Sequence, residues 1–251
     1  MKLSIQRLNK TYANGLHALT DINLTLEEGL HFLIGPTGAG KSTLLRILAT
    51  LQEPDEGRVR LGELDRVAHR EDFHRMVAYV CQEPRWYSCS TIEAHLDREA
   101  MQLGFHDPEQ RRATIGRALS RVNLRGVRRG LIAKGSADMR KRLDLAVSLL
   151  ADPRLILLDE PADGLDAMER RELFEIIRSL SSNRVVLMAS KCAEDMHCDA
   201  ASVTFLDHGT IPGPQRVREV LTATPEIGFP GSRGDSEFIT SGRPGPAQPS
   251  L

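Results

Sequence analysis

The nine residues GPTGAGKST, from Gly35 to Thr43, have the types and spacing needed to bind phosphate groups. They follow the apolar run LHFLI and open the predicted helix KSTLLRILAT, the strand–loop–helix context that a phosphate loop requires. Glycines let the backbone curl so that successive N–H groups point at phosphate oxygens, and the helix adds its positive N-terminal end. We expect Lys41 to neutralise the β- and γ-phosphates of a nucleotide and the Ser42 hydroxyl to coordinate Mg²⁺. The candidate nucleotide-binding residues of this loop are Gly35, Pro36, Thr37, Gly38, Ala39, Gly40, Lys41, Ser42 and Thr43.

A second run, LILLDEP at residues 155–161, supplies acidic side chains of the kind that such a site needs. Its apolar part predicts a buried strand that delivers Asp159 to the carboxyl end, where α/β sheets bind their ligands. There Asp159 can hold Mg²⁺ directly or through water. Glu160 follows and can act as general base on an attacking water. Surface acids are common, so the prediction depends on the buried strand and on the phosphate loop upstream.

Seven short apolar or alternating runs predict the strands that position these residues, and the fully apolar ones suit a largely parallel sheet buried on both faces. They lie at 3–8, 21–26, 30–35, 76–80, 155–159, 184–190 and 201–206. Between about residues 85 and 151 the pattern becomes helical, with a capping box at Ser90 and Glu93 and an N-cap at Asp107 before Pro108. A further helix follows residue 161, and its apolar stripe contains Leu173, Phe174, Ile176, Ile177 and Leu180.

Composition and net charge limit the classes of protein to which the chain can belong. The chain has 251 residues, 41% of them hydrophobic, and a formal net charge of -1, so nothing electrostatic indicates nucleic acid or an anionic membrane as partner. No apolar run reaches transmembrane length, and the first ten residues are too polar for a signal peptide. Four cysteines without CxxC spacing favour reduced thiols in the cytoplasm. A membrane role would therefore require a partner protein.

With these motifs in place, the sequence resembles the nucleotide-binding subunit of ABC transporters over roughly residues 2–212. The resemblance implies an α/β fold: a P-loop NTPase core with a mostly parallel sheet, an N-terminal antiparallel β subdomain and an inserted helical subdomain. The expected divisions are a first part of the core at 1–84, the helical subdomain at 85–151, a second part of the core at 152–224, and a Gly-, Pro- and Ser-rich disordered tail at 225–251. The implied ligands are ATP and Mg²⁺.

The same resemblance implies roles for further residues. Tyr12, in the run KTY, matches the aromatic residue that stacks on adenine; the alternative is an ordinary tyrosine at a strand edge. Gln82 matches the glutamine that touches Mg²⁺ and the attacking water. The expected catalytic residues are thus Glu160, Lys41 and Gln82, and the expected metal ligands are Ser42, Gln82 and Asp159. In the run ADGLD, Asp163 stands where the family has a small residue.

The resemblance also implies partners. Two such subunits face head to tail, so that each ATP lies between one phosphate loop and the signature sequence of the other subunit. The chain would pair with itself or with a different subunit, on the cytoplasmic face of a membrane, and the stretch Arg85, Trp86 and Tyr87 would dock on a transmembrane permease. Trp86 can equally be ordinary interdomain packing. The run MRKRL resembles export ATPases, which favours export.

Two positions depart from the family pattern. Met139 lies 20 residues before Asp159, the family's spacing, so Ser136, Ala137 and Asp138 take the last three positions of the signature LSGG. Ser136 can still hydrogen-bond a phosphate. The Asp138 carboxylate, about 4 Å from one phosphate charge, would cost about 4 kcal/mol at an effective dielectric constant of about 20. The alternative role of Asp138, as N-cap of the following helix, would stabilise that helix by only about 1 kcal/mol. We therefore expect Asp138 to face no γ-phosphate in a closed dimer.

The second departure is Lys191, which occupies the position of the histidine that contacts the γ-phosphate. A lysine offers donors and a fixed charge but no acceptor, and the alternative is a solvated lysine in a loop. Since Lys41, Asp159 and Glu160 are intact, the sequence predicts slow or partner-dependent ATP hydrolysis coupled to transport. Two alternatives stay open: an ATP-binding regulatory subunit with little or no hydrolysis, and a soluble ABC ATPase without a transport role.

Overall fold

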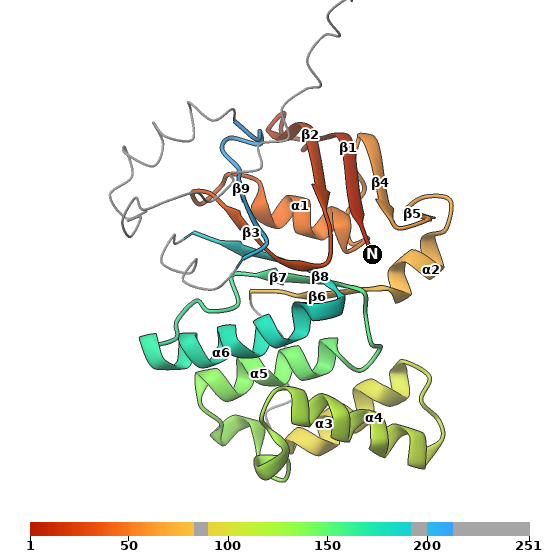
Figure 1. The fold of residues 1–251 in the computed structure, drawn as a ribbon, viewed down its shortest axis with the longest axis vertical. Coiled ribbons are helices and arrows are strands. Elements are labelled where there is room, and N and C mark those ends of the chain that lie inside the picture. The colour runs from red at the N-terminus through yellow and green to blue at the C-terminus, as the bar shows by residue number, and fades with distance from the viewer. Residues whose placement is uncertain (83–89, 192–199, 213–251) are drawn as a thin grey trace, which may run out of the picture.

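Five parallel strands form the central sheet of the computed structural model, which describes residues 1–82, 90–191 and 200–212 (Figure 1). Their order is β6-β7-β8-β3-β9. The strands are β6 (Val77–Val80), β7 (Leu155–Asp159), β8 (Val185–Ser190), β3 (Gly29–Ile34) and β9 (Ser202–Phe205). Every residue of β7 and β8 is buried, as expected for apolar runs covered on both faces. The expectations for residues 85–87 and for the tail lie outside the described residues.

A second, antiparallel sheet has the order β2-β1-β4-β5. It contains β1 (Leu3–Thr11), β2 (His17–Leu26), β4 (Glu56–Leu61) and the short β5 (Leu64–Asp65). The sequence predicts β1 and β2 but not β4, which reads EGRVRL and buries only Val59 and Leu61. With its other residues exposed or half-buried, β4 lacks the continuous apolar signal, and its pairing with β1 decides its structure.

One helix fills the space between the two sheets. Helix α1 (Lys41–Leu48) lies against one face of the parallel sheet, with the antiparallel sheet on its other side (Figure 1). Its buried Leu44, Leu45 and Ile47 join apolar residues of both sheets in a single cluster. The short α2 (Arg70–Arg75) leads from β5 into β6. The packing of α1 between the sheets therefore holds the C-terminal end of the phosphate loop in place.

The remaining helices lie on the opposite face of the parallel sheet (Figure 1). Helices α5 (Ala137–Ser148) and α6 (Ala167–Leu180) are nearest to it, and α3 (Ile92–Gln102) and α4 (Pro108–Arg121) pack beyond them. Short 3₁₀ turns occupy Arg125–Val127, Ile132–Lys134 and Ser181–Asn183. The apolar stripe predicted for α6 is buried, and Phe174 meets Phe32 of β3 edge to face with 6.5 Å between ring centroids. The predicted fold class is confirmed.

Of the two N-caps predicted for this region, the structure confirms one and places the other one residue later. Asp107 caps α4, where its carboxylate accepts the Gln110 N–H at 2.8 Å, as predicted. The predicted capping box at Ser90 is wrong by one residue, because the Thr91 hydroxyl caps α3 and accepts the Ala94 N–H at 3.2 Å. The backbone of Ser90 instead accepts a hydrogen bond from Ile132, a pairing that local sequence does not reveal.

Candidate functional site: the phosphate loop and the acidic strand end

The phosphate loop joins β3 to α1 and has the backbone that its glycines predict. Gly40 lies at φ 102° directly before the helix, in the left-handed region that favours glycine. A Cβ at Gly35 would lie 2.1 Å from the Leu206 carbonyl oxygen, so this position also excludes larger residues. The Lys41 ammonium donates to the carbonyl oxygens of Gly35 at 2.7 Å and of Pro36 at 3.1 Å. The lysine therefore folds back over the loop, and burial lowers its pKa.

The end of β7 brings Asp159 to this loop. The Ser42 hydroxyl donates to Asp159 Oδ1 at 3.0 Å, and Asp159 is 2% exposed. The second carboxylate oxygen, Oδ2, accepts the Tyr79 hydroxyl at 3.0 Å. A hydroxyl beside a carboxylate suits Mg²⁺, which prefers oxygen ligands and takes only one or two carboxylates together with phosphates and water. Tyr79 was not predicted; its place in the strand next to β7 was the signal available.

Glu160 lies between two ammonium groups. Its Oε1 is 3.8 Å from Lys41 Nζ, and its Oε2 is 3.0 Å from Lys191 Nζ. Gln82 Nε2 also donates to Oε2, at 3.2 Å, so the structure brings together all three residues predicted to be catalytic. The hydrogen bond from Lys191 to Glu160 raises the pKa of the lysine above its usual value. Lys191 therefore stays a cationic donor at neutral pH; its side chain is 40% exposed and ion-paired, and contact with a γ-phosphate stays a prediction.

Asp163 belongs to the same cluster. Its Oδ2 accepts from Gln82 Nε2 at 3.3 Å and lies 3.5 Å from Lys191 Nζ. The loop after β7 thus places a second carboxylate beside Lys191. The sequence singles out Asp163 and Lys191 separately, whereas the fold shows that the two side chains face each other.

Tyr12 follows β1 and lies beside the phosphate-loop helix. Its hydroxyl is 3.0 Å from Thr43 Oγ1 and donates to Gln52 Oε1 at 3.4 Å. The hydroxyl end of the ring is thereby tied to the last residue of the GPTGAGKST motif. Stacking on adenine stays a prediction.

The signature-like stretch lies at the start of α5. Ser136 is its N-cap and accepts the Met139 N–H at 3.1 Å. The alternative of an N-cap at Asp138 is therefore wrong, because the serine two residues earlier takes that position. Asp138 is 8% exposed, and its Oδ1 accepts from Arg142 Nε at 2.8 Å. Arg142 also pairs with Glu172 of α6, so one guanidinium is shared by two carboxylates.

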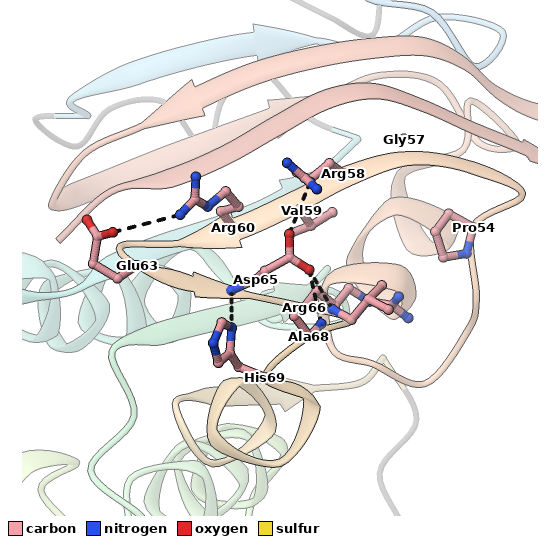
Figure 2. Close-up of a pocket in the computed structure, with 11 residues that line it drawn as sticks. Pro54, Gly57, Arg58, Val59, Arg60, Glu63, Asp65, Arg66, Ala68 and His69 are labelled. Atoms are coloured by element: carbon pink, nitrogen blue, oxygen red, sulfur yellow. Dashed lines mark hydrogen bonds and ion pairs between the residues drawn. The ribbon is translucent and has the colours of Figure 1, made fainter.

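A separate groove of about 550 Å³ lies on the antiparallel sheet (Figure 2). It contains none of the predicted site residues; it is lined by Pro54, Gly57, Arg58, Val59, Arg60, Glu63, Asp65, Arg66, Val67, Ala68 and His69. Its three arginines are already paired: Arg58 with Asp65 at 3.1 Å, Arg60 with Glu63 at 3.8 Å and Arg66 with Glu53 at 2.8 Å. The groove therefore offers no uncompensated charge, and the phosphate loop is the better nucleotide site.

With this geometry established, comparison with known proteins identifies the family. The family model described as ABC transporter matches residues 19–163. The sulfate/thiosulfate import ATP-binding protein CysA of Synechocystis sp. is 34% identical over 181 residues, which are 72% of this chain and 50% of CysA. The lantibiotic transport ATP-binding protein SrtF of Streptococcus pyogenes is 33% identical over 189 residues, 75% of this chain and 79% of SrtF. The chain belongs to the ABC transporter family of ATP-binding proteins.

Solved structures support the fold. The structure of cbiO1 from Clostridium perfringens, part of the ABC transporter complex cbiONQ, matches with a TM-score of 0.76 and 23% identity, over 88% of this chain and 93% of that one. At this identity the match shows the fold alone. The chain spans only half the length of CysA. Within the described ranges, no helix has the length and apolar character needed to cross a membrane.

Proposed function

We propose that this chain is the ATP-hydrolysing subunit of a membrane ABC transporter and drives transport, in the export direction, through a separate membrane protein. One observation carries the proposal: the phosphate loop and the acidic strand end meet in a single site. Ser42 Oγ and Asp159 Oδ1 are 3.0 Å apart, and Lys41 Nζ and Glu160 Oε1 are 3.8 Å apart. A glycine-rich turn without function would have no reason to face these two carboxylates.

Each residue then has a chemical role. The backbone N–H groups of residues 37–40 and the Lys41 ammonium bind the phosphates of ATP, while the Tyr12 ring stacks on adenine. Ser42 and Asp159, with Gln82, would hold Mg²⁺, which would supply positive charge beside the phosphate oxygens. Glu160 accepts the proton of the attacking water. For this step the Glu160 carboxylate must first lose its ion pair with Lys191.

The departures from the family support slow or partner-dependent hydrolysis. Lys191 holds the general base in an ion pair at 3.0 Å, and its raised pKa prevents it from giving up a proton near neutral pH. Asp138 is a milder change than its charge alone suggests, because Arg142 pairs with it at 2.8 Å and offsets part of its charge. The repulsion of about 4 kcal/mol expected for a bare carboxylate beside a phosphate is therefore an upper bound.

Partners follow from the family and from the two faces of the sheet. Helix α1 and helix α5 cover opposite faces, which favours a role of Ser136 at the nucleotide of a second subunit rather than at this chain's own (Figure 1). We propose a dimer of such subunits on the cytoplasmic face of a membrane, docked on a transmembrane permease, with no nucleic-acid partner. The proposed parts are the core at 1–84 and 152–224 and the helical subdomain at 85–151.

The alternative is an ATP-binding regulatory subunit that closes and opens with little or no hydrolysis. The ion pairs of Glu160 with both Lys41 and Lys191 favour it, since they occupy both oxygens of the base. A soluble ABC ATPase without a transport role is a weaker alternative, and co-purification with a membrane protein would distinguish it.

The test is steady-state hydrolysis of Mg-ATP by the full chain, alone and co-purified with its membrane protein. Glu160→Gln should lower kcat by at least about 100-fold, the usual contribution of a general base, while nucleotide binding persists. Lys41→Ala should abolish binding. Glu175→Gln makes the same change on the exposed face of α6 and should leave turnover unchanged. Tight binding without Glu160-dependent turnover would favour the regulatory alternative, and no binding would contradict both.

A further inference from the structure

Two residues that depart from the family pattern face each other in the fold. Lys191 Nζ and Asp163 Oδ2 are 3.5 Å apart, although 28 residues separate them in the chain. Lys191 directly follows β8, and Asp163 lies in the loop after β7. These strands are parallel neighbours, paired up to Asp159 and Ala189, so their carboxyl ends open onto the same edge of the sheet. The two departures therefore form one charge pair.

The pair lies beside the proposed base and the phosphate-loop lysine. Lys191 Nζ is 3.0 Å from one oxygen of Glu160, whose other oxygen is 3.8 Å from Lys41 Nζ. Two ammonium groups and two carboxylates thus alternate across the mouth of the phosphate loop. Asp163 gives the Lys191 ammonium a second anion to pair with, so Glu160 can leave Lys191 without leaving that cation unpaired.

We propose that Asp163 is a positioning residue that holds the Lys191 ammonium beside the phosphate loop, where the ammonium contacts the terminal phosphate of a nucleoside triphosphate. The inference rests on the proposed function of this site. The Lys191 contact exists only when a third phosphate is present, so it favours the triphosphate over the diphosphate.

The proposal predicts that the two residues are coupled. Removal of Lys191 alone leaves the Asp163 carboxylate without its cation, hydrogen-bonded to the neutral Gln82 amide. The carboxylate then faces the phosphates and repels them. Removal of Asp163 alone leaves Lys191 paired with Glu160, and so poorly placed for the phosphate. Removal of both takes away the cation and the unpaired anion together. The double change should therefore cost less than the product of the two single changes.

The test is a double-mutant cycle on the full chain with Lys191→Met, Asp163→Asn and both changes. Calorimetry would give the Kd of the Mg²⁺ complexes of ADP and of the non-hydrolysable triphosphate analogue adenylyl imidodiphosphate. For the triphosphate we expect losses of about tenfold for Lys191→Met and about threefold for Asp163→Asn, but only about fivefold for the double variant. For ADP we expect each variant to bind within about twofold of the parent chain.

Two controls separate positioning from general damage to the fold. Arg75 and Asp72 form an exposed pair at 3.6 Å on α2, so Arg75→Met and Asp72→Asn remove equivalent groups away from the site and should change neither Kd. Lys191→Arg keeps the cation and should restore most of the preference for the triphosphate. A loss of folding would instead weaken both nucleotides equally.

The outcomes are distinguishable. Additive losses, or equal losses for the two nucleotides, would overturn the pairing of Lys191 with Asp163 while Lys41-dependent binding still supported the proposed function. Absence of triphosphate binding by the parent chain, or binding that survives Lys41→Ala, would overturn the proposed function and this inference with it. Coupled losses confined to the triphosphate would support both.

Discussion

Glu160 has a backbone conformation that residues other than glycine seldom adopt. Its φ is 49°, in the left-handed region, and such a conformation costs about 1–3 kcal/mol. The Glu160 N–H donates to the Ala189 carbonyl oxygen of the neighbouring strand at 3.1 Å, which holds the turn in place. The turn directs the side chain away from the axis of β7 and between the two ammonium groups. Local strain therefore coincides with the proposed base.

Tyr79 is the residue beside Asp159 that the sequence did not reveal. Tyr79→Phe should lower the free energy of unfolding by about 1–2 kcal/mol, because a buried carboxylate oxygen loses its hydrogen-bond donor. Urea unfolding without nucleotide would measure the change. Tyr12→Phe is the matched control, since its hydroxyl contacts the uncharged Thr43 and Gln52, and it should cost less than about 1 kcal/mol. Equal losses of unfolding free energy in the two variants would contradict a stabilising role for the hydrogen bond from Tyr79 to Asp159.

At the scale of elements, the signature-like helix α5 is joined to α6 through a buried charge. Arg142 is 8% exposed and pairs with Asp138 of its own helix and with Glu172 of α6. Arg142→Met should destabilise the fold by about 3 kcal/mol, because the buried Asp138 carboxylate loses its partner. Thermal or urea unfolding would measure this loss.

A second substitution tests the cause of that loss. Adding Asp138→Asn to Arg142→Met removes the unpaired charge and should recover part of the stability. A single-variant loss below about 1 kcal/mol, or no recovery in the double variant, would show that the pair contributes only packing. Both measurements are made without nucleotide, so they do not depend on the proposed function.

At the scale of the whole molecule, the parallel sheet separates two apolar clusters, and its edge strand is fixed partly by a histidine. His31 of β3 is 4% exposed, and its Nδ1 is 2.7 Å from the hydroxyl of Ser202 in β9. Its Nε2 is 2.8 Å from the Glu27 carbonyl oxygen. Burial lowers the pKa of His31 below its usual value of 6.5. The neutral ring is therefore part of the folded state.

This burial predicts how global stability depends on pH. Below about pH 6.5 the unfolded chain binds a proton at His31 that the folded chain does not, so the free energy of unfolding should fall as pH decreases from 7 to 5. His95, whose pKa burial also lowers, contributes in the same direction. In urea unfolding at several pH values, His31→Gln should show a shallower dependence. The exposed His106→Gln serves as control; an unchanged slope for His31→Gln would contradict the prediction.

Patterns within a few residues predicted much of the molecule. Strands such as Leu155–Asp159 are short, apolar and bounded by turn residues, and the stripe on α6 repeats with helical period, so neighbouring residues suffice to recognise them. Strand β4 was not predicted, because alternation of apolar residues with arginine does not distinguish a half-buried strand from a loop. The N-cap of α3 is Thr91 and not the predicted Ser90, because the distant residues Leu131 and Ile132 pair with the backbone there.

The sequence by itself determined the phosphate loop, the acidic pair at the end of β7 and the α/β class, because each depends on residue types at short, constant spacing. Only the tertiary structure decided the contacts inside the site and added Tyr79 and Asp163 to it. Ser42 meets Asp159 across 117 residues, Tyr79 meets Asp159 across 80, and Lys191 meets Asp163 across 28. Parallel strands place their carboxyl ends at one edge whatever their separation in the chain, so these contacts follow from strand order, which no local pattern contains.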